Sequence, residues 1–187
     1  FMELQAGTID ILKHLTSAQV QTLNDSFKVE SGSMNLVQAM FLNSAYEPLS
    51  KKEVRQALCY GVDRDAINQF LFGGKSHLIG SHMIPNMAVY YEPQAEKVYS
   101  YDPAKAKELL TEAGYPDGFD LEITVPSSYS QHVDTAQIIV EELSQIGVNA
   151  TINQVEWSTW LSDVYTDGKF EATVIGFDGT LAPNDWL

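Results

Sequence analysis

The strongest constraint on the fold is an alternation of strand and helix patterns between residues 120 and 178. Apolar and polar residues alternate in three runs, at 121–125, 148–153 and 170–174. A period of two is typical of strands. Between the first two runs, apolar residues recur at helical spacing over 136–146, and Gly147 stands at the C-cap position. Between the second and third runs, a shorter helix is predicted from about Trp157 to Thr166.

The resulting order of strand, helix, strand, helix, strand predicts an α/β fold. We expect a mixed sheet flanked by helices, in which crossovers return each strand to one sheet. After the third run comes Gly176-Phe177-Asp178-Gly179, where the chain is expected to leave the sheet. Binding sites of open α/β sheets lie outside the strand ends, so this exit is the first place to look for function.

Composition narrows the classes of partner. The chain has 187 residues, 44% of them hydrophobic, which is enough for one substantial core and indicates one domain. A formal net charge of -14 with only 11 Lys and Arg disfavours nucleic acid and anionic membrane surfaces as partners. From Glu156 onward the chain has six acidic residues and one basic residue, Lys169. The acidic residues form either the acidic mouth of a binding site, which favours cations, or a solvated acidic face.

Residues 1–33 are predicted to be peripheral to this pattern. A capping box at Thr16 and Gln19 opens a short helix there, and a strand is expected at 27–30. The short apolar run at 36–42 fits a buried strand, with a helix as the alternative. Ser50, with Glu53 three residues on, is expected to cap a helix with the inner stripe Val54, Ala57, Leu58 and Gly61. Asp63 starts a further helix that ends at Gly73-Gly74, with the expected inner face Ala66, Ile67, Phe70 and Leu71. Cys59 is interpreted as a small buried hydrophobe.

Residues 77–99 interrupt this regular pattern. They contain Pro85, Pro93 and the tyrosines Tyr90, Tyr91 and Tyr99, which indicate a long irregular loop. Its rings either carry aromatic contacts to a ligand or fix the loop to the core. Asp102 and Pro103 then begin a helix with the inner stripe Ala106, Leu109, Leu110 and Ala113.

The sequence shows no pattern for catalysis, a cofactor or a metal. Gly74-Lys75-Ser76 imitates the end of a phosphate loop, but Gln69 stands where that motif requires glycine. No Gly-x-Ser-x-Gly elbow occurs, and a helical Cys59 is a poor nucleophile. The four histidines, His14, His77, His82 and His132, lack metal-ligand spacing and are expected to be structural or exposed.

Two segments resemble a known family. They are PLSKKEVRQALCYGVDRDAI at residues 48–67 and YDPAKAKELLTEAGYPDGFDLEI at residues 101–123. Both are similar to the extracytoplasmic solute-binding proteins of ABC importers in the oligopeptide, dipeptide and nickel group. The resemblance extends through Ile146-Gly147-Val148, Glu156-Trp157 and Gly176-Phe177.

The resemblance implies a lobe of the type II periplasmic-binding-protein class within a two-lobed protein. Residues 1–33 are then a hinge-proximal segment at the crossing between lobes, and residues 34–187 are the C-terminal ligand-binding lobe, excised from a longer chain. Its implied partners are the missing N-terminal lobe, a small-molecule solute and an ABC permease in the membrane. The implied location is outside the cytoplasm, in the periplasm or as a lipid-anchored lipoprotein, with the targeting signal outside this sequence.

Ligand-binding residues carry over unevenly from the resemblance. Trp157 matches a tryptophan that lies against the ligand in peptide-binding members, and Phe177 stands where they often have another. The aspartate that receives the amino terminus of a peptide corresponds to Thr180, and Asp178 would substitute for it only with a spacing that differs by two. An oligopeptide and an oligosaccharide bound by aromatic stacking therefore both stand as ligand classes. An interaction module that uses the fold without a small ligand is the third interpretation.

Overall fold

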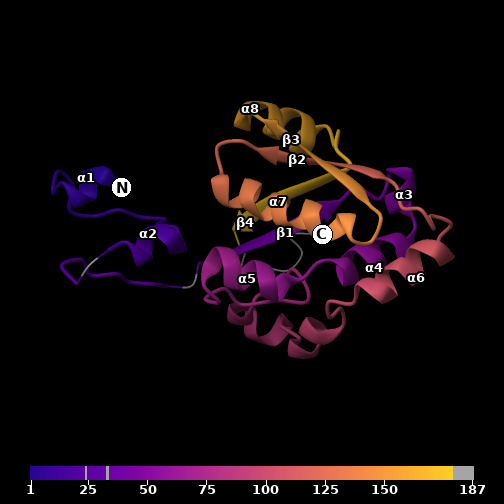
Figure 1. Ribbon diagram of the computed structural model, residues 1–187, viewed down its shortest axis with the longest axis horizontal. Coiled ribbons are helices and arrows are strands. Elements are labelled where there is room, and N and C mark those ends of the chain that lie inside the picture. Colours follow the sequence, from indigo (N-terminus) through magenta and orange to yellow (C-terminus); the bar gives the residue numbers. More distant parts are fainter. Residues whose placement is uncertain (24, 33, 179–187) are drawn as a thin grey trace.

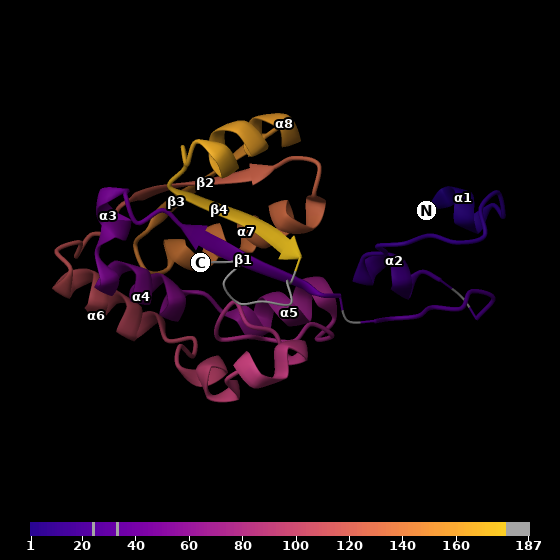
Figure 2. The ribbon, with the colours of Figure 1, turned by 180° about the vertical axis from the view of Figure 1, so that it is seen from behind.

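The structure is a computed structural model that describes residues 1–23, 25–32 and 34–178. The described residues before 34 form an arm that stands away from the main body in both views (Figure 1, Figure 2). The arm holds α1 (Met2–Gln5) and α2 (Ser17–Gln21), and the predicted capping box of Thr16 and Gln19 is present. The strand predicted at 27–30 is wrong: the segment has no strand beside it among the described residues, and Lys28, Val29 and Glu30 are exposed.

A mixed sheet of four strands lies at the centre of the body. Its strands are β1 (Leu36–Leu42), β2 (Asp120–Pro126), β3 (Asn149–Val155) and β4 (Ala172–Asp178), in the spatial order β1-β4-β2-β3. β2 is parallel to both β3 and β4, whereas β1 is antiparallel to β4. The α/β class and the mixed sheet predicted from the sequence are confirmed.

The position of β4 corrects one prediction. The strand begins at Ala172 rather than Phe170 and continues through Gly176, Phe177 and Asp178, which were expected to lie beyond the sheet. The extension results from pairing with β1, whose register runs to Leu36 opposite Asp178. Because β1 lies far away in the sequence, the local pattern around 170–178 could not show this pairing.

Helices cover both faces of the sheet. One face packs in a single core with α4 (Lys52–Gly61), α5 (Arg64–Phe72), α6 (Pro103–Glu112) and α7 (Ser130–Ser144). The other face meets α8 (Trp157–Thr159) and the π-helix η3 (Trp160–Thr166), where Trp160 and Val164 contact Ile175 (Figure 2). The predicted stripes on α6 and α7, including Leu109, Leu110, Ile139 and Leu143, are buried in the first core. Among the described residues, no helix is both long and apolar enough to cross a membrane.

Most predicted helix caps agree with the structure, but those at Ser50 and Gly147 differ: Gly147 lies two residues beyond Gln145, the C-cap residue of α7. Asp63 and Asp102 cap α5 and α6, and Gly73 ends α5 in the left-handed conformation. Ser50 does not cap α4: it ends the short helix α3 (Glu47–Ser50), which begins early because Pro48 favours the first helical turn, and Lys51 stands at the N-cap of α4.

Two burial predictions are also wrong. On α5 the buried residues are Ile67 and Asn68, whereas Ala66 is exposed and Phe70 is 78% exposed. Asn68 turns inward because its side chain bonds the backbone of Ser76 in both directions, at 3.0 and 3.1 Å. Cys59 is exposed, since Ala57 and Leu58 occupy the inner stripe of α4.

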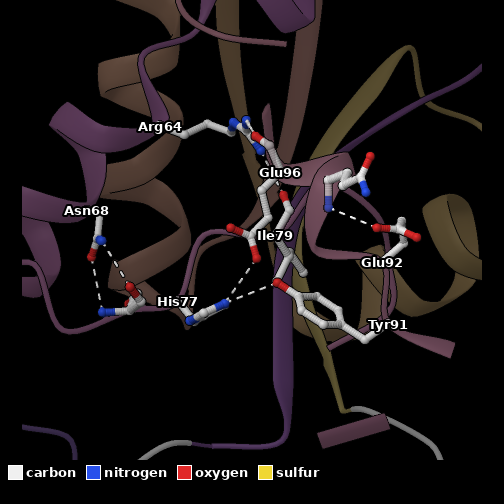
Figure 3. Close-up of polar contacts among 9 residues, drawn as sticks. Arg64, Asn68, His77, Ile79, Tyr91, Glu92 and Glu96 are labelled. Atoms are coloured by element: carbon white, nitrogen blue, oxygen red, sulfur yellow. Dashed lines mark hydrogen bonds and ion pairs between the residues drawn. The ribbon is translucent and has the colours of Figure 1, made fainter. Parts of the chain in front are cut away.

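The loop over residues 77–99 is held mainly by α5 (Figure 3). It contains the 3-10 helices η1 (Pro85–Tyr90) and η2 (Pro93–Lys97). The guanidinium of Arg64 donates to three of its carbonyl oxygens, those of Ile79, Glu96 and Tyr99, at 2.7, 3.1 and 3.0 Å. His77 Nε2 lies 3.1 Å from the Tyr91 hydroxyl and 3.3 Å from Glu96 Oε1.

The tyrosines of this loop divide between the two roles considered for them. Tyr99 packs edge-on against Tyr60, and Tyr91 packs against a small cluster of Val37, Met83, Ile84 and Met87. These two rings therefore help to hold the loop against the body. Tyr90 is exposed, so its ring is left at the surface.

Candidate ligand-binding site

The carboxyl ends of the three parallel strands β2, β3 and β4 meet at one edge of the sheet. The chain leaving β2 soon reaches Tyr129, the chain leaving β3 reaches Trp157 two residues after the strand, and Phe177 and Asp178 end β4. A hydrogen bond of 2.8 Å from Ser127 N–H to Val155 O joins the first two exits. The topology therefore collects aromatic side chains at the edge where α/β sheets bind ligands.

Trp157 is the most prominent side chain at this edge. Its ring is stacked on that of Trp160, with centroids 5.2 Å apart and an interplanar angle of 4°, and the edge of Tyr129 meets it at 5.3 Å and 76°. Trp157 is 37% exposed, whereas Trp160 is 2% exposed. Trp157 thus lies at the surface of the stack and Trp160 in the core.

Trp160 fixes the platform on which Trp157 lies. Its Nε1–H donates a buried hydrogen bond of 3.0 Å to Thr173 Oγ1 in β4. Its other neighbours include Val164 and Ile175, in the same apolar cluster. A tryptophan held by packing and by its polar atom has little rotational freedom, so the face it offers to Trp157 is rigid.

Phe177 lies beside this platform rather than at the open edge. The ring is half-buried, meets Phe41 of β1 edge-on at 5.1 Å and 79°, and lies 6.4 Å from Trp160. Asp178, the next residue of β4, is exposed. Thr180, the fourth predicted ligand-binding residue, lies outside the described residues. The structure thus brings Trp157 and Phe177 to one aromatic cluster and places Asp178 at its end.

His132 of α7 links the helix to the end of β4. Its Nε2 accepts a hydrogen bond of 3.2 Å from Gly176 N–H, and its Nδ1 lies 2.7 Å from Gln38 Oε1 on β1. The ring also packs against Tyr129, with centroids 5.6 Å apart. Burial lowers the pKa of His132 below its ordinary value. The sequence predicts only a structural or exposed role for this histidine, because its partners Gln38 and Gly176 are distant along the chain.

The described acidic residues from Glu156 onward are divided between this edge and other parts of the surface. Glu156 and Asp178 are exposed near the carboxyl ends of the strands. Glu171 instead lies at the amino end of β4, where its Oε2 accepts a bond of 2.7 Å from Glu122 N–H. Asp167 pairs with Lys169 at 2.8 Å. Asp185 lies outside the described residues. This dispersion favours a solvated acidic surface over an acidic mouth.

A separate hollow of about 330 Å³ opens at the amino ends of β2 and β3. It is lined by Tyr46, Asp120, Leu121, Glu122, Asn149, Thr151 and Glu171. Its carboxylates already accept hydrogen bonds: Asp120 from Asn149 at 2.8 Å and Glu122 from Asn153 at 3.1 Å. Within the described part of the chain, no group of three or more His, Cys, Asp or Glu residues could hold a metal ion.

Comparisons with known proteins agree with this architecture. A sequence profile described as "Bacterial extracellular solute-binding proteins, family 5 Middle" matches residues 1–187. Heme-binding protein A of Haemophilus influenzae is 30% identical over 186 residues, which are 96% of this chain and 33% of the relative. A glutathione-binding protein of Shigella flexneri serotype 5b is 28% identical over 189 residues, which are 98% of this chain and 37% of the relative.

A solved structure extends the similarity to the fold. A dipeptide binding protein from Pseudoalteromonas sp. SM9913, in complex with Met-Leu, matches with a TM-score of 0.84 and 29% identity. The match covers 100% of this chain and 38% of that chain. The chain thus spans about a third of the length of the curated relatives it matches.

Proposed function

Since this chain belongs to the bacterial extracellular solute-binding proteins of family 5, we propose that it is the C-terminal lobe of the solute-binding component of an ABC importer. In this proposal, residues 34–187 form one wall of a ligand cleft, and residues 1–33 lie next to the hinge that leads to the other lobe. The protein captures an oligopeptide or a similar small solute outside the cytoplasm and delivers it to a membrane permease. It performs no catalysis.

The observation that carries the proposal is the stacked pair of Trp157 and Trp160 at the carboxyl edge of the sheet. A half-exposed indole on a rigid, buried partner is a preorganised surface for an apolar or planar ligand group, because its rotamer is fixed before the ligand arrives. Phe177 supports this platform from β4. The names of the related proteins, which concern heme, glutathione and a dipeptide, support a small solute as the ligand class.

The charged end of a peptide requires a partner in this cleft. Removing a charged group from water without a partner of opposite charge costs several kcal/mol. Asp178 is the acidic residue at the described end of β4, and we assign it to a ligand amino group, with Thr180, two residues later in the sequence, as a polar contact. The carboxylate is exposed in this lobe and becomes desolvated only when the other lobe closes over it.

The aromatic edge also favours a second candidate, an oligosaccharide. Sugar rings stack on indole faces and need no carboxylate for a terminal amine. Tyr129 and Trp157 meet at 76°, so they offer a ring edge and a ring face at one place. An interaction module without a small ligand is the remaining alternative, and it predicts that no soluble probe binds at Trp157. We propose a periplasmic or lipid-anchored location for any of the ligand-binding forms.

The test is isothermal titration of the full-length protein and its Trp157→Ala variant with glutathione, Met-Leu and cellopentaose. We expect one of these probes to bind the wild type and to lose about tenfold or more in the variant, since an aromatic anchor contributes on the order of 1–2 kcal/mol. Phe70→Ala removes an exposed ring from α5 and is the matched control, with unchanged affinity. Equal loss in both variants, or none in Trp157→Ala, contradicts the assignment of Trp157.

A further inference from the structure

We propose that His132 is a positioning residue for the candidate site: in its neutral form it holds the carboxyl end of β4 against α7, and uptake of a proton releases that end and weakens ligand binding. This inference rests on the proposed function, because Phe177 and Asp178 belong to the same end of β4. It adds a dependence on pH that neither the fold nor the aromatic platform implies.

The carboxyl-terminal part of β4 is paired with a strand on one side only, because β2 does not pair along it. β2 and β4 are paired only at Ile123 with Ala172 and at Thr124 with Thr173. Beyond Thr173, β4 continues for five residues to Asp178 with β1 as its partner strand. Gly176 N–H meets a side chain instead of a strand, because His132 Nε2 accepts its hydrogen bond at 3.2 Å.

The hydrogen-bond chain through His132 has a fixed direction. Gly176 N–H can only donate, so Nε2 carries no proton, and the neutral ring has its proton on Nδ1. This Nδ1–H donates to Gln38 Oε1 at 2.7 Å. Gln38 Nε2 donates to Thr135 Oγ1 at 2.8 Å, and Thr135 donates to Gln131 O at 2.8 Å. Both ends of the chain are backbone groups whose roles cannot change.

Protonation of His132 breaks its hydrogen bond with Gly176. Imidazolium has N–H donors on both ring nitrogens, so Nε2–H would face Gly176 N–H, and the amide would lose its acceptor. The ring has little room to turn away. A methyl group at Gly176 would lie 3.2 Å from His132 Cε1 and 2.6 Å from Leu36 Cδ2, which shows how closely these groups approach. The strain falls on β4 immediately before Phe177 and Asp178.

The elements around His132 bring few charges that could offset this effect. β1 and β3 contain no ionisable residue. β4 contributes the exposed Asp178, and α7 the exposed Asp134. Asp120 and Glu122 of β2 lie towards its opposite end, in the hollow described above. The Tyr129 phenol ring packs against the imidazole, with centroids 5.6 Å apart. Burial alone lowers the pKa of His132, so the proton is taken up below the ordinary range.

A ligand-free measurement tests the positioning role directly. In full-length protein labelled with 15N at histidine and glycine, nuclear magnetic resonance should show the Nδ1–H tautomer of His132 at pH 7.5. The Gly176 amide resonance should follow the titration of His132, and it should not follow that of His77. An Nε2–H tautomer, or a Gly176 amide that ignores the protonation of His132, overturns the proposal whether or not any ligand is found.

Titration calorimetry at pH 7.5 and pH 5 tests the effect on binding, with glutathione and Met-Leu as probes. We expect wild-type affinity to fall about three- to tenfold at pH 5, which corresponds to one hydrogen bond. His132→Gln keeps an uncharged acceptor near the position of Nε2, so it should bind as wild type does at pH 7.5 and lose the pH dependence. His132→Leu should bind weakly at both pH values.

His77→Gln removes an exposed histidine of the 77–99 loop and is the matched control, which should retain the wild-type pH dependence. The same pH dependence in His132→Gln as in wild type contradicts the inference. If neither probe binds wild type at either pH, the proposed peptide class of ligand fails, and the resonance experiment alone decides the role of His132.

Discussion

A buried hydrogen bond between Trp160 and Thr173 connects the core of the protein to the candidate site. The indole N–H of Trp160 donates to Thr173 Oγ1, and its ring face packs against Trp157. The position of the exposed Trp157 ring therefore depends on Trp160, which is buried beneath it. Thr173 lies in β4 at the last position that pairs with β2. Buried residues, Thr173 and Trp160, therefore fix the position of the exposed ring at the site.

Thr173→Val should show this dependence. The substitution keeps the volume of the side chain but leaves the Trp160 N–H buried without an acceptor, which should lower the free energy of unfolding by about 1–3 kcal/mol. Urea unfolding measures the loss. Thr151→Val, at an exposed position of β3, is the matched control and should stay within about 0.5 kcal/mol of wild type. A similar small change in both variants would mean that the bond to Thr173 contributes nothing.

At the residue scale, the sequence predicted individual positions only where the reason was local. Trp157 was identified by the resemblance of Glu156-Trp157 to a family pattern, and its partial exposure agrees with that role. His132 could not be connected to the site, because Gly176 and Gln38 lie 44 and 94 residues away along the chain. Cys59 was placed inside because the run around it is apolar, but neighbouring residues fill the inner stripe.

At the scale of elements, α7 and α5 are joined by a carboxylate. Glu142 Oε2 accepts a hydrogen bond of 3.0 Å from Asp63 N–H, and Asp63 in turn caps α5 by accepting from Ala66 N–H. Burial, with a smaller contribution from the nearby Asp63 carboxylate, raises the pKa of Glu142 to about 7, although the hydrogen bond from Asp63 N–H lowers it. Two helices therefore meet at a group that titrates near neutral pH.

This contact predicts a pH dependence of stability. The folded state keeps the Glu142 proton between the ordinary pKa of 4.5 and the folded value of about 7, whereas the unfolded state has released it. The contribution of Glu142 to the free energy of unfolding should thus be fully present below pH 4.5 and should decline as the pH rises from 4.5 to about 7. Glu142→Gln keeps an acceptor for Asp63 N–H and removes the titration.

Urea unfolding at pH 4.5 and pH 8 checks this prediction. Relative to wild type, Glu142→Gln should gain about 2–3 kcal/mol at pH 8 and little at pH 4.5. Glu141→Gln, on the exposed side of the same helix, should leave the difference between the two pH values unchanged. If Glu142→Gln and wild type decline in parallel with pH, the carboxylate at this contact does not titrate in that range.

Helices and strands were predicted correctly where buried residues recur at helix or strand spacing. The predictions failed where pairing with a distant part of the chain determines the structure. The stripes of α6 and α7 follow helical spacing, and Leu109, Leu110, Ile139 and Leu143 are buried, as are Leu121, Ile123 and Val125 of β2 and Ala150 of β3, whereas Ile152 is only partly buried. The end of β4 depends on β1, and the inward turn of Asn68 depends on the backbone of Ser76, so neither is visible in a local window. The strand expected at 27–30 had the pattern but no neighbour to pair with among the described residues.

At the scale of the whole molecule, the proposed function makes this chain one wall of a ligand cleft. It spans about a third of the length of its curated relatives, and the arm before residue 34 stands away from the body (Figure 1). Trp157 is 37% exposed at the carboxyl edge of the sheet. In the proposed two-lobed protein, the second wall covers this edge and removes water from the ligand.

We therefore predict that the isolated chain of 187 residues folds but binds its ligand poorly. A receptor with micromolar affinity has about -8 kcal/mol of binding free energy, which remains after the cost of immobilising the ligand has been met by contacts from both walls. Removing one wall deletes a large part of the contacts but little of that cost, so the residual affinity should be about millimolar or weaker. Calorimetric titration of this chain and of the full-length protein with the same probe compares the two. Equal affinities would place the complete site in this lobe, and the need for closure by a second lobe would then be refuted.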